Sequence, residues 1–167
     1  MTSPDIKPDC VEAFIALGSN LDEPQHNVRR AIQYIQQHPD IQLVATSSLY
    51  RTAPVGYLNQ DDFINAVIQV RTSLSATALL AFLLDIEQQF GRQRPFKDAP
   101  RTLDLDLLLY GTLICHTPQL ILPHPRMHQR AFVMVPLQEI APELHLPGLG
   151  NARQIAQQLS HAGIDKI

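Results

Sequence analysis

The chain contains no tryptophan and only two cysteines, Cys10 and Cys115, which lie far apart and match no metal-binding spacing. We therefore expect two reduced thiols rather than a disulfide or a zinc site. There is no run of about 18 apolar residues, so the sequence predicts no membrane span and no membrane partner. Residues 1–9 lack the basic start and apolar core of a signal peptide, which indicates a cytoplasmic protein.

Two common nucleotide-binding signatures are also missing. The chain has neither a Walker A loop nor a Gly-x-Gly-x-x-Gly turn, so a P-loop or Rossmann site is not supported. A net charge of −3 argues against a general polyanion binder, and we expect no nucleic-acid partner. The length of 167 residues suits one domain with a real core. We expect a monomeric single domain over residues 1–167, with residues 1–10 as a flexible tail.

The densest apolar stretch, residues 101–110, carries two aspartates. In a strand, Asp104 and Asp106 point to one face and the leucines to the other. Two carboxylates on one face of a central strand are costly unless a positive partner lies between them. Six Lys or Arg and three Asp lie between residues 92 and 130, so we expect a divalent cation and a phosphate site. The alternative is that the aspartates pair with arginines and only hold a loop.

Hydrophobic periodicity predicts strands over residues 11–17, 41–50, 63–70 and 104–110. Helices are predicted from Pro24, over residues 76–90, over 130–140 and over 152–160. Asn20 or Asp22 is expected to cap the first helix, and Ser73 or Ser75 the second. The order β-α-β-β-α-β is typical of an α+β ferredoxin-like sandwich with additional C-terminal elements. Its helices would cover one face of the sheet, and a ligand would use the other face, open or covered by loops.

Two polar side chains stand out as candidates for ligand contact. His124 lies between two prolines, with Arg126 and Arg130 following, and is placed to donate a hydrogen bond to a phosphate. The alternative is an ordinary packed or surface histidine. Asn65 shares a strand face with Phe63, so an amide beside an aromatic ring would suit a flat heterocycle. The alternative is a strand asparagine bonded to a neighbouring loop.

Seven short stretches resemble one enzyme family, the 6-hydroxymethyl-7,8-dihydropterin pyrophosphokinases of folate biosynthesis. They are residues 14–21, 50–56, 63–66, 90–94, 100–111, 123–127 and 130–132. The likeness runs from about residue 12 to 145. Its most specific part is the Arg-Thr-Leu-Asp-Leu-Asp block followed by Pro-His-Pro.

The resemblance implies transfer of pyrophosphate from ATP to the pterin hydroxymethyl group, with AMP as the second product, and two Mg²⁺ ions on Asp104 and Asp106. It implies catalytic roles for Arg92, Arg101, Asp104 and Asp106. The implied ATP site comprises Leu80, Glu87, Arg92, Arg94, Arg101, Leu107, Ile121, His124 and Arg130. The implied pterin site comprises Thr52, Ala53, Val55, Phe63, Asn65 and Phe132. No general base is implied.

The chain also departs from the family pattern. The loop before Arg101 lacks the tryptophan of many members, and Asp98-Ala99-Pro100 stands there. Leu84 and Gln119 replace a glutamine and an arginine of some members. Two rival functions remain: an RNA-binding β-α-β-β-α-β module and a different Asp-x-Asp transferase. The first conflicts with an acidic sheet face, and the second lacks its expected nucleotide-binding fold.

Overall fold

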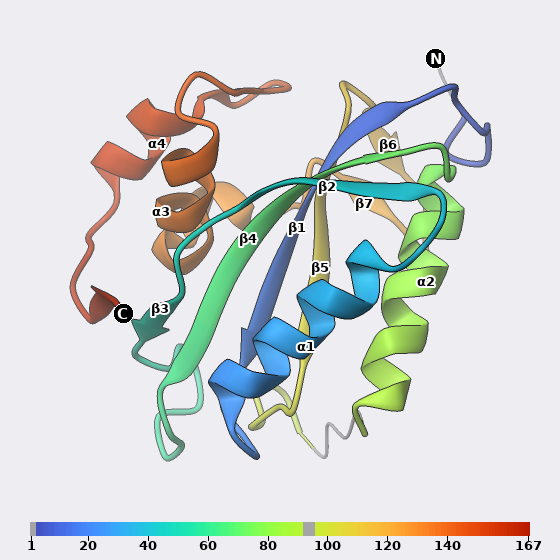
Figure 1. Cartoon of the computed structure of the whole chain (residues 1–167). Helices are drawn as coiled ribbons and strands as arrows, with labels where there is room; N and C mark the ends of the chain where they lie inside the picture. The colour runs from blue at the N-terminus through green and yellow to red at the C-terminus, as the bar shows by residue number, and fades with distance from the viewer. Residues whose placement is uncertain (1–2, 92–95) are drawn as a thin grey trace.

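The computed structural model describes residues 3–91 and 96–167. Its main element is a six-stranded antiparallel sheet in the order β10-β3-β4-β1-β5, with β2 also paired to β4 (Figure 1). The strands are β1 (Val11–Ser19), β2 (Ile41–Thr46), β3 (Tyr50–Thr52), β4 (Phe63–Thr72), β5 (Asp104–Tyr110) and β10 (Ile164–Lys166). The long strand β1 lies inside the sheet, paired with β4 on one edge and β5 on the other, as its apolar sequence predicts.

The strand expected over residues 41–50 is wrong in one respect, because it forms two strands. The interruption lies at Ser47, whose backbone N–H donates to Val67 O and whose Oγ accepts from Val67 N–H. A side-chain oxygen thus replaces a backbone acceptor, and the regular ladder stops. The chain then resumes pairing with β4 as β3.

Strand β5 is not central as expected but terminal in the sheet, because it pairs only with β1 among the described strands. Its outer edge still has partners. Leu105 N–H donates to the Glu87 carboxylate at 2.7 Å, and His124 N–H donates to Leu108 O at 2.9 Å. Buried backbone groups are thereby satisfied without another strand.

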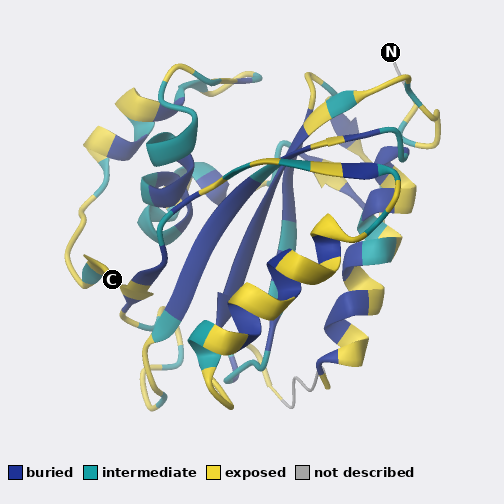
Figure 2. Ribbon diagram, in the orientation of Figure 1, coloured by how far each residue is buried: buried dark blue, intermediate teal, exposed yellow. Residues whose placement is uncertain are grey.

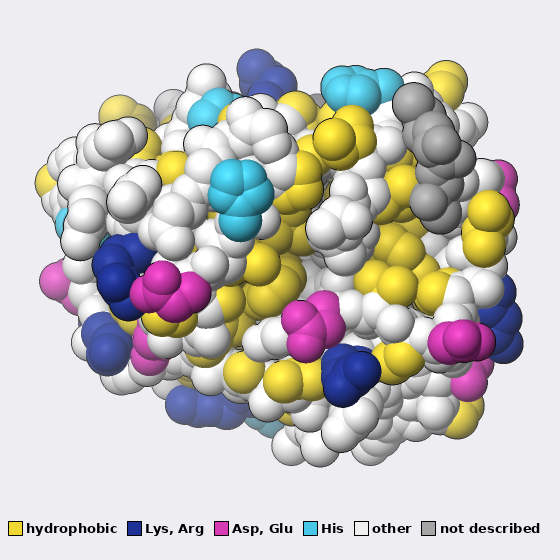
Figure 3. All heavy atoms as spheres, turned by 90° about the horizontal axis from the view of Figure 1, so that it is seen from above, with side chains coloured by type: hydrophobic (Ala, Val, Ile, Leu, Met, Phe, Trp, Pro, Cys, Tyr) yellow, Lys and Arg dark blue, Asp and Glu magenta, His cyan; other side chains and the backbone are white. Residues whose placement is uncertain are grey.

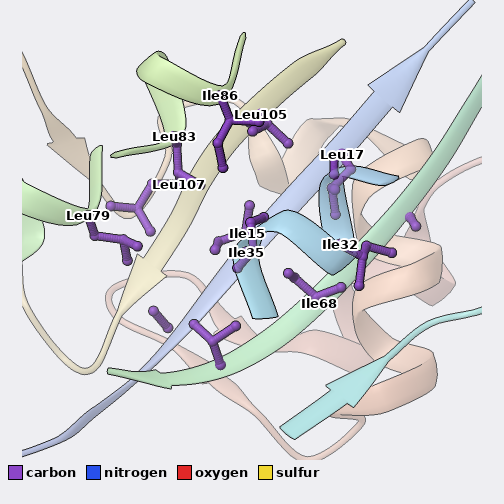
Figure 4. Packing of buried hydrophobic residues seen from close by; sticks show 14 of the residues in the cluster. Ile15, Leu17, Ile32, Ile35, Ile68, Leu79, Leu83, Ile86, Leu105 and Leu107 are labelled. Carbon is purple, nitrogen blue, oxygen red and sulfur yellow. The ribbon is translucent and has the colours of Figure 1, made fainter. Parts of the chain in front are cut away.

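One sheet face is covered by α1 (Pro24–Gln36) and α2 (Ala76–Gln89). Figure 4 shows the resulting core, in which Ile15 and Leu17 of β1 pack with helix residues such as Ile35 and Leu83. Leu105 and Leu107 point into this core, which confirms the alternation predicted for β5. In Figure 2 the outer sides of both helices are exposed while the strands beneath are buried.

The second face is not left open or covered only by loops, as expected, but is partly covered by α3 (Ala131–Ile140) and α4 (Ala152–Gln158). Val133, Met134 and Leu137 pack there against apolar residues of the sheet, Phe14, Ala16 and Val67. The remaining elements are β6 (Cys115–His116) paired with β7 (Ile121–Leu122), β8 (His145–Leu146) paired with β9 (Gly150–Asn151), and the 3-10 helix η1 (Met127–Gln129).

The predicted N-cap residue is correct for α2 and wrong for α1, although α1 begins at Pro24 as predicted. Ser75 caps α2 by accepting from Ala78 N–H at 3.1 Å, and Gly91 follows its last turn with φ +76°. The N-cap of α1 is Glu23, without a side-chain cap. Asn20 is diverted from capping because its amide donates to Gln60 and to Asp61 O.

The loops that follow β1 and β3 and the segment that precedes β5 gather at one end of the sheet, at the bottom of Figure 1. The opposite end, viewed in Figure 3, has described basic side chains that are dispersed and in several places lie beside acidic ones. Both cysteines are free thiols, as expected. Among the described residues, no helix is long and apolar enough to cross a membrane.

Candidate functional site

The floor of the site is a row of three residues on neighbouring strands. Gly18 of β1 lies directly between Asp104 of β5 and Asn65 of β4 in the sheet register. Adjacent strands lie about 4.8 Å apart, so the backbones of Asp104 and Asn65 lie about 10 Å apart, with only the glycine between them. A Cβ at Gly18 would lie 2.7 Å from Asn65 Oδ1, so this open floor requires glycine.

The second row places Asp106 opposite Ala16, which itself pairs with Val67. Here the intervening side chain is a single methyl group. Asp104, Asp106, Ala16, Gly18 and Asn65 all line one cavity on the face that α3 only partly covers. The two aspartates therefore share a face and a cavity, as the strand alternation predicts.

Arg101 is a described basic residue in direct contact with Asp104 of this pair. Its Nη1 lies 2.7 Å from Asp104 Oδ2, and its Nη2 lies 3.9 Å from Asp98 Oδ1. The Arg101 Nε is buried and has no acceptor among the described residues. Because a buried unpaired donor is costly, the guanidinium is ready to accept an anionic ligand as a further partner.

The six residues of the implied pterin site all line this first cavity: Thr52, Ala53, Val55, Phe63, Asn65 and Phe132. Asn65 Nδ2 donates to Thr52 Oγ1 at 2.5 Å, and both residues are buried. The amide is thus fixed by Thr52 of the neighbouring strand β3 rather than by a loop, and this bond also orients its oxygen. Phe63 and Phe132 come from opposite layers, the sheet and α3.

A second cavity lies along the outer edge of β5. It is lined by four residues of the implied ATP site that come from α2, β5 and β7, namely Leu80, Glu87, Leu107 and Ile121, and by His124. Leu84 and Gln119, the two departures from the family pattern, line it as well. Most of its lining residues are leucine, isoleucine or proline, which suits a planar heterocycle. Glu87 is 2% exposed and accepts from Leu105 N–H, so it braces β5 beneath this cavity.

A third cavity joins the other two and concentrates positive charge. Lys97, Arg101, Arg126 and Arg130 line it together with His124 and three aspartates, Asp98, Asp104 and Asp106. Asp104 and Asp106 line all three cavities, so the aspartate pair lies at their junction. Arg130 also lies over the Phe132 ring, 5.6 Å from its centroid. The implied residues Arg92 and Arg94 lie outside the described residues.

His124 is held as a neutral hydrogen-bond donor. Burial, followed by the charge of Arg130, lowers its pKa to about 4, although Asp104 acts in the opposite direction. Its Nδ1 accepts from Arg126 N–H at 3.2 Å. The proton of the neutral ring therefore sits on Nε2, and this N–H is available to a ligand.

The donor set at the junction suits a hard cation. Mg²⁺ takes oxygen ligands, often one or two carboxylates completed by phosphate oxygens and water. Asp104 and Asp106 offer such carboxylates, while no group of three or more His, Cys, Asp or Glu gathers as a metal site in residues 3–91 and 96–167. A cation here would therefore depend on a phosphate-bearing ligand for further oxygens.

Two loops meet beside the first cavity. The rings of Tyr57 and Phe96 make an edge contact with centroids 4.9 Å apart, and Gln60 Nε2 donates to Asp98 O at 3.0 Å. Asn20 ties both loops to the end of β1, since it donates to Gln60 Oε1 and accepts from Arg101 N–H. In the segment without the family's tryptophan, Phe96 supplies an aromatic contact to the other loop.

Several cavity residues were not assigned a role from the sequence. Gly18 and Ala16 were missed because their importance depends on which residues they face, and strand register cannot be read from a single strand. Lys97 and Arg126 were noted only as flanking basic residues, and Asp98 only as part of a loop. The sequence feature that could have indicated the two basic residues is the local surplus of positive charge between residues 92 and 130.

An apolar cavity, a cavity between two aromatic rings and a charged junction between them together suit an enzyme that joins a phosphate-bearing molecule to a flat heterocycle.

Comparison with known proteins specifies the class of enzyme. The family model for 7,8-dihydro-6-hydroxymethylpterin-pyrophosphokinase matches residues 14–142. The 2-amino-4-hydroxy-6-hydroxymethyldihydropteridine pyrophosphokinase of Haemophilus influenzae is 43% identical over 157 residues, which cover 94% of this chain and 98% of that protein. The protein of the same description from Bacillus subtilis is 42% identical over 132 residues, or 79% of each chain.

Among solved structures, the Plasmodium falciparum HPPK-DHPS wild type with pteroate has a TM-score of 0.71 and 13% identity over 90% of this chain. This chain spans only 42% of that longer protein, and at such identity the likeness shows the fold alone. The chain belongs to the 7,8-dihydro-6-hydroxymethylpterin-pyrophosphokinase family, which confirms the resemblance seen in the sequence. It is a diphosphotransferase of folate biosynthesis that acts on the hydroxymethyl-dihydropterin.

Proposed function

We propose that this enzyme binds the pterin in the cavity between Phe63 and Phe132 and ATP in the cavity along β5. Asp104 and Asp106 then lie between the two substrates. The observation that carries this assignment is that one aspartate pair lines all three adjoining cavities. Six residues implied for the pterin and five implied for ATP line separate cavities on either side of it.

The pterin assignment rests on shape and polarity. A flat ring fits between two phenylalanines, and Asn65 presents an amide whose donor side is already bonded to Thr52. Backbone groups of Thr52, Ala53 and Val55 close the same cavity. Gly18 leaves room for the hydroxymethyl group to approach the aspartates across the floor.

The ATP assignment rests on the apolar edge cavity and the charged junction. Leu80, Leu107 and Ile121 would contact the adenosine, with Glu87 supporting β5. Arg101, Arg130 and the Nε2–H of His124 would bind the phosphates, and Arg92 and Arg94 complete the proposed set. Two Mg²⁺ ions held by Asp104, Asp106 and phosphate oxygens would neutralise charge that develops during transfer.

In the reaction, the pterin hydroxymethyl oxygen attacks the β-phosphorus of ATP. A bond forms between that oxygen and the β-phosphorus, and the bond to the oxygen bridging the α- and β-phosphates breaks. AMP leaves, and the hydroxyl proton, for which no general base is assigned, passes to a phosphate oxygen of the products and reaches solvent when they are released. Arg92 and Arg101 contribute positive charge opposite the transferred group, while closure of the two loops would exclude water.

The fold proposed for this activity is a ferredoxin-like βαββαβ sandwich with α3, α4 and β10 as additions, forming one domain over residues 1–167. We propose a monomer that works in the cytoplasm. An RNA-binding module is disfavoured because α3 and α4 pack over Phe14 and Val67, on the face where bases would stack.

The test is AMP release from ATP in the presence and absence of 6-hydroxymethyl-7,8-dihydropterin, with and without Mg²⁺. We expect AMP and a pterin diphosphate in equal amounts, and neither product when the pterin or Mg²⁺ is omitted. Release of ADP, or AMP release that does not depend on the pterin, would contradict the proposal. An Asp104→Ala variant with wild-type activity would contradict the role of the aspartates.

A further inference from the structure

Glu139 joins α3 to the strand that forms one wall of the pterin cavity. Its Oε1 accepts from Ser48 N–H at 2.9 Å and from the Tyr50 hydroxyl at 2.8 Å. Its Oε2 accepts from the Ser48 hydroxyl at 2.6 Å and lies 3.7 Å from Lys166 Nζ. One carboxylate of α3 therefore holds the chain just before β3, the first residue of β3 and the last residue of β10.

Electrostatics indicate that this carboxylate is charged. Burial alone would raise the pKa of Glu139, but hydrogen bonds from Ser48 and Tyr50 and the charge of Lys166 lower it below its usual value. Burial, followed by the hydrogen bond to Glu139, raises the pKa of Tyr50. The contact is thus between an ionised acceptor and neutral donors, which is stronger than a bond between two neutral groups.

The C-terminal segment holds β3 from its other side. Ile164–Lys166 pairs with Tyr50–Thr52 in antiparallel register. Beyond both ends of this ladder, Ala53 N–H donates to Gly163 O at 2.9 Å and Ile167 N–H donates to Leu49 O at 3.0 Å. β3 has only three residues and pairs with β4 on its other edge, so β10 completes its pairing and, through Gly163 O, holds Ala53 beyond the end of the ladder.

The geometry of α3 connects this contact to the opposite wall of the cavity. Phe132 and Glu139 are seven residues apart, which places them on the same side of the helix, about 10 Å apart along its axis. Phe132 lines the pterin cavity opposite Thr52 and Asn65. A tether at Glu139 therefore fixes the position of α3, and with it Phe132, relative to β3.

We infer that Glu139 and β10 are positioning elements for pterin recognition, which set the distance between Phe132 on α3 and Thr52 and Ala53 on β3. This inference rests on the proposed pterin site. It concerns in part a segment beyond the family match, which ends at residue 142. Glu139 and β10 line neither the ATP cavity nor the charged junction, so their effect falls mainly on the pterin, although Arg130 at the N-cap of α3 links this helix to the phosphates.

The main experiment compares Glu139→Ala, Glu139→Gln and Tyr50→Phe with Glu143→Ala. Glu143 is the matched control because its ion pair with Arg153, at 2.7 Å, holds no part of the cavity wall. For each variant, the KM for the pterin, the KM for ATP, kcat and the melting temperature are measured. Pterin affinity is also measured by calorimetry in the absence of ATP.

We expect the pterin KM and dissociation constant to rise about 10-fold in Glu139→Ala, where several hydrogen bonds are lost, and about 3-fold in Tyr50→Phe. Glu139→Gln keeps one acceptor oxygen and should recover part of the loss. The ATP KM should stay within about 2-fold of wild type in every variant, and Glu143→Ala should match wild type.

A second pair of variants tests β10 without touching Glu139. A Cβ at Gly163, which has φ +76°, would lie 3.0 Å from the Ala53 Cβ, whereas Gly148 has φ +73° and no atom within 4 Å of its Cβ position. Both Gly163→Ala and Gly148→Ala strain the backbone. Only Gly163→Ala should raise the pterin KM. Gly148→Ala serves as the control for backbone strain without a contact to β3.

The inference is overturned if the melting temperature falls while pterin KM and affinity remain within about 2-fold of wild type, or if the KM for ATP rises equally. Should Glu139→Ala fail to fold, Tyr50→Phe and Gly163→Ala decide the question. Failure of the proposed function looks different, because the wild-type enzyme itself would then neither bind the pterin nor release AMP in its presence.

Discussion

The two faces of the sheet use the same strands for different purposes. On the face covered by α1 and α2, alternate residues of β1, β4 and β5 are mainly leucine, isoleucine, valine and alanine, and they form a closed apolar core (Figure 4). On the other face, Phe14 and Val67 are buried by α3, while the next positions along β1 and β4 are Ala16, Gly18 and Asn65. Packing thus ends partway along this face, and a polar cavity begins where side chains become small.

This difference predicts that, of two neighbouring residues in one strand, one mainly affects catalysis and the other mainly affects stability. In β5, Asp106→Asn keeps the shape of the side chain but removes its charge, so we expect kcat to fall about 10³-fold while the melting temperature changes little. Leu105→Ala, on the core face, should cost about 2–5 kcal/mol of unfolding free energy because it leaves a cavity beside the helices. Its melting temperature should fall by about 5–15 °C.

Steady-state kinetics and thermal unfolding of both variants check this separation. Leu105→Ala should retain most of its kcat at temperatures well below its transition, and because Leu105 also lines the ATP cavity, its effect on activity should appear in the KM for ATP. The comparison between the faces fails if Asp106→Asn unfolds as readily as Leu105→Ala, or if the two variants lose activity to the same extent.

A smaller effect should follow from filling the floor of the cavity. In Gly18→Ala, the new methyl group would meet Asn65 Oδ1, so the amide must move away from Thr52. We expect the pterin KM to rise about 10-fold, equivalent to about 1.4 kcal/mol, with little change in the KM for ATP. An unchanged pterin KM would show that Asn65 does not take part in pterin binding.

The smallest effect concerns protonation at the junction. Because the pKa of His124 lies at about 4 in the folded chain, the ring should stay neutral throughout the range from pH 6 to 8. The unfolded chain binds this proton at higher pH, so His124 makes folding less favourable as the pH falls from about 6.5 towards 4. Side-chain NMR of histidines, assigned with His124→Gln, measures the midpoint, and a value above 6 would contradict this environment.

Much of the fold is encoded in local patterns. The alternation of Asp104 and Asp106 with leucines, the capping by Ser75 and the apolar run of β1 each predicted a feature that the structure contains. The order of the strands in the sheet could not be predicted in the same way. An apolar strand at a covered edge, such as β5, has the same sequence pattern as a strand inside the sheet. The division of residues 41–50 depends on Ser47 bonding to Val67, a contact between distant segments.

Prediction of the site is limited in the same way, because it too depends on contacts between distant segments. Residues implied for the pterin and ATP come together in space, yet the reason they do so lies partly in Gly18, whose position between Asp104 and Asn65 depends on the register of three strands. The role of α3 as a cover for the second face was also not predicted. Its apolar residues indicated a helix but did not specify which surface it would bury.

The terminal position of β5 has a further consequence for the solubility of the enzyme. A leucine-rich strand with an unsatisfied outer edge is a template for addition of strands from other molecules and hence for aggregation. Glu87 and the backbone of His124 occupy hydrogen-bonding positions along that edge, at Leu105 and Leu108. Residues beside the nucleotide cavity therefore also act as solubility determinants, and substitutions at Glu87 should increase precipitation at high protein concentration as well as altering catalysis.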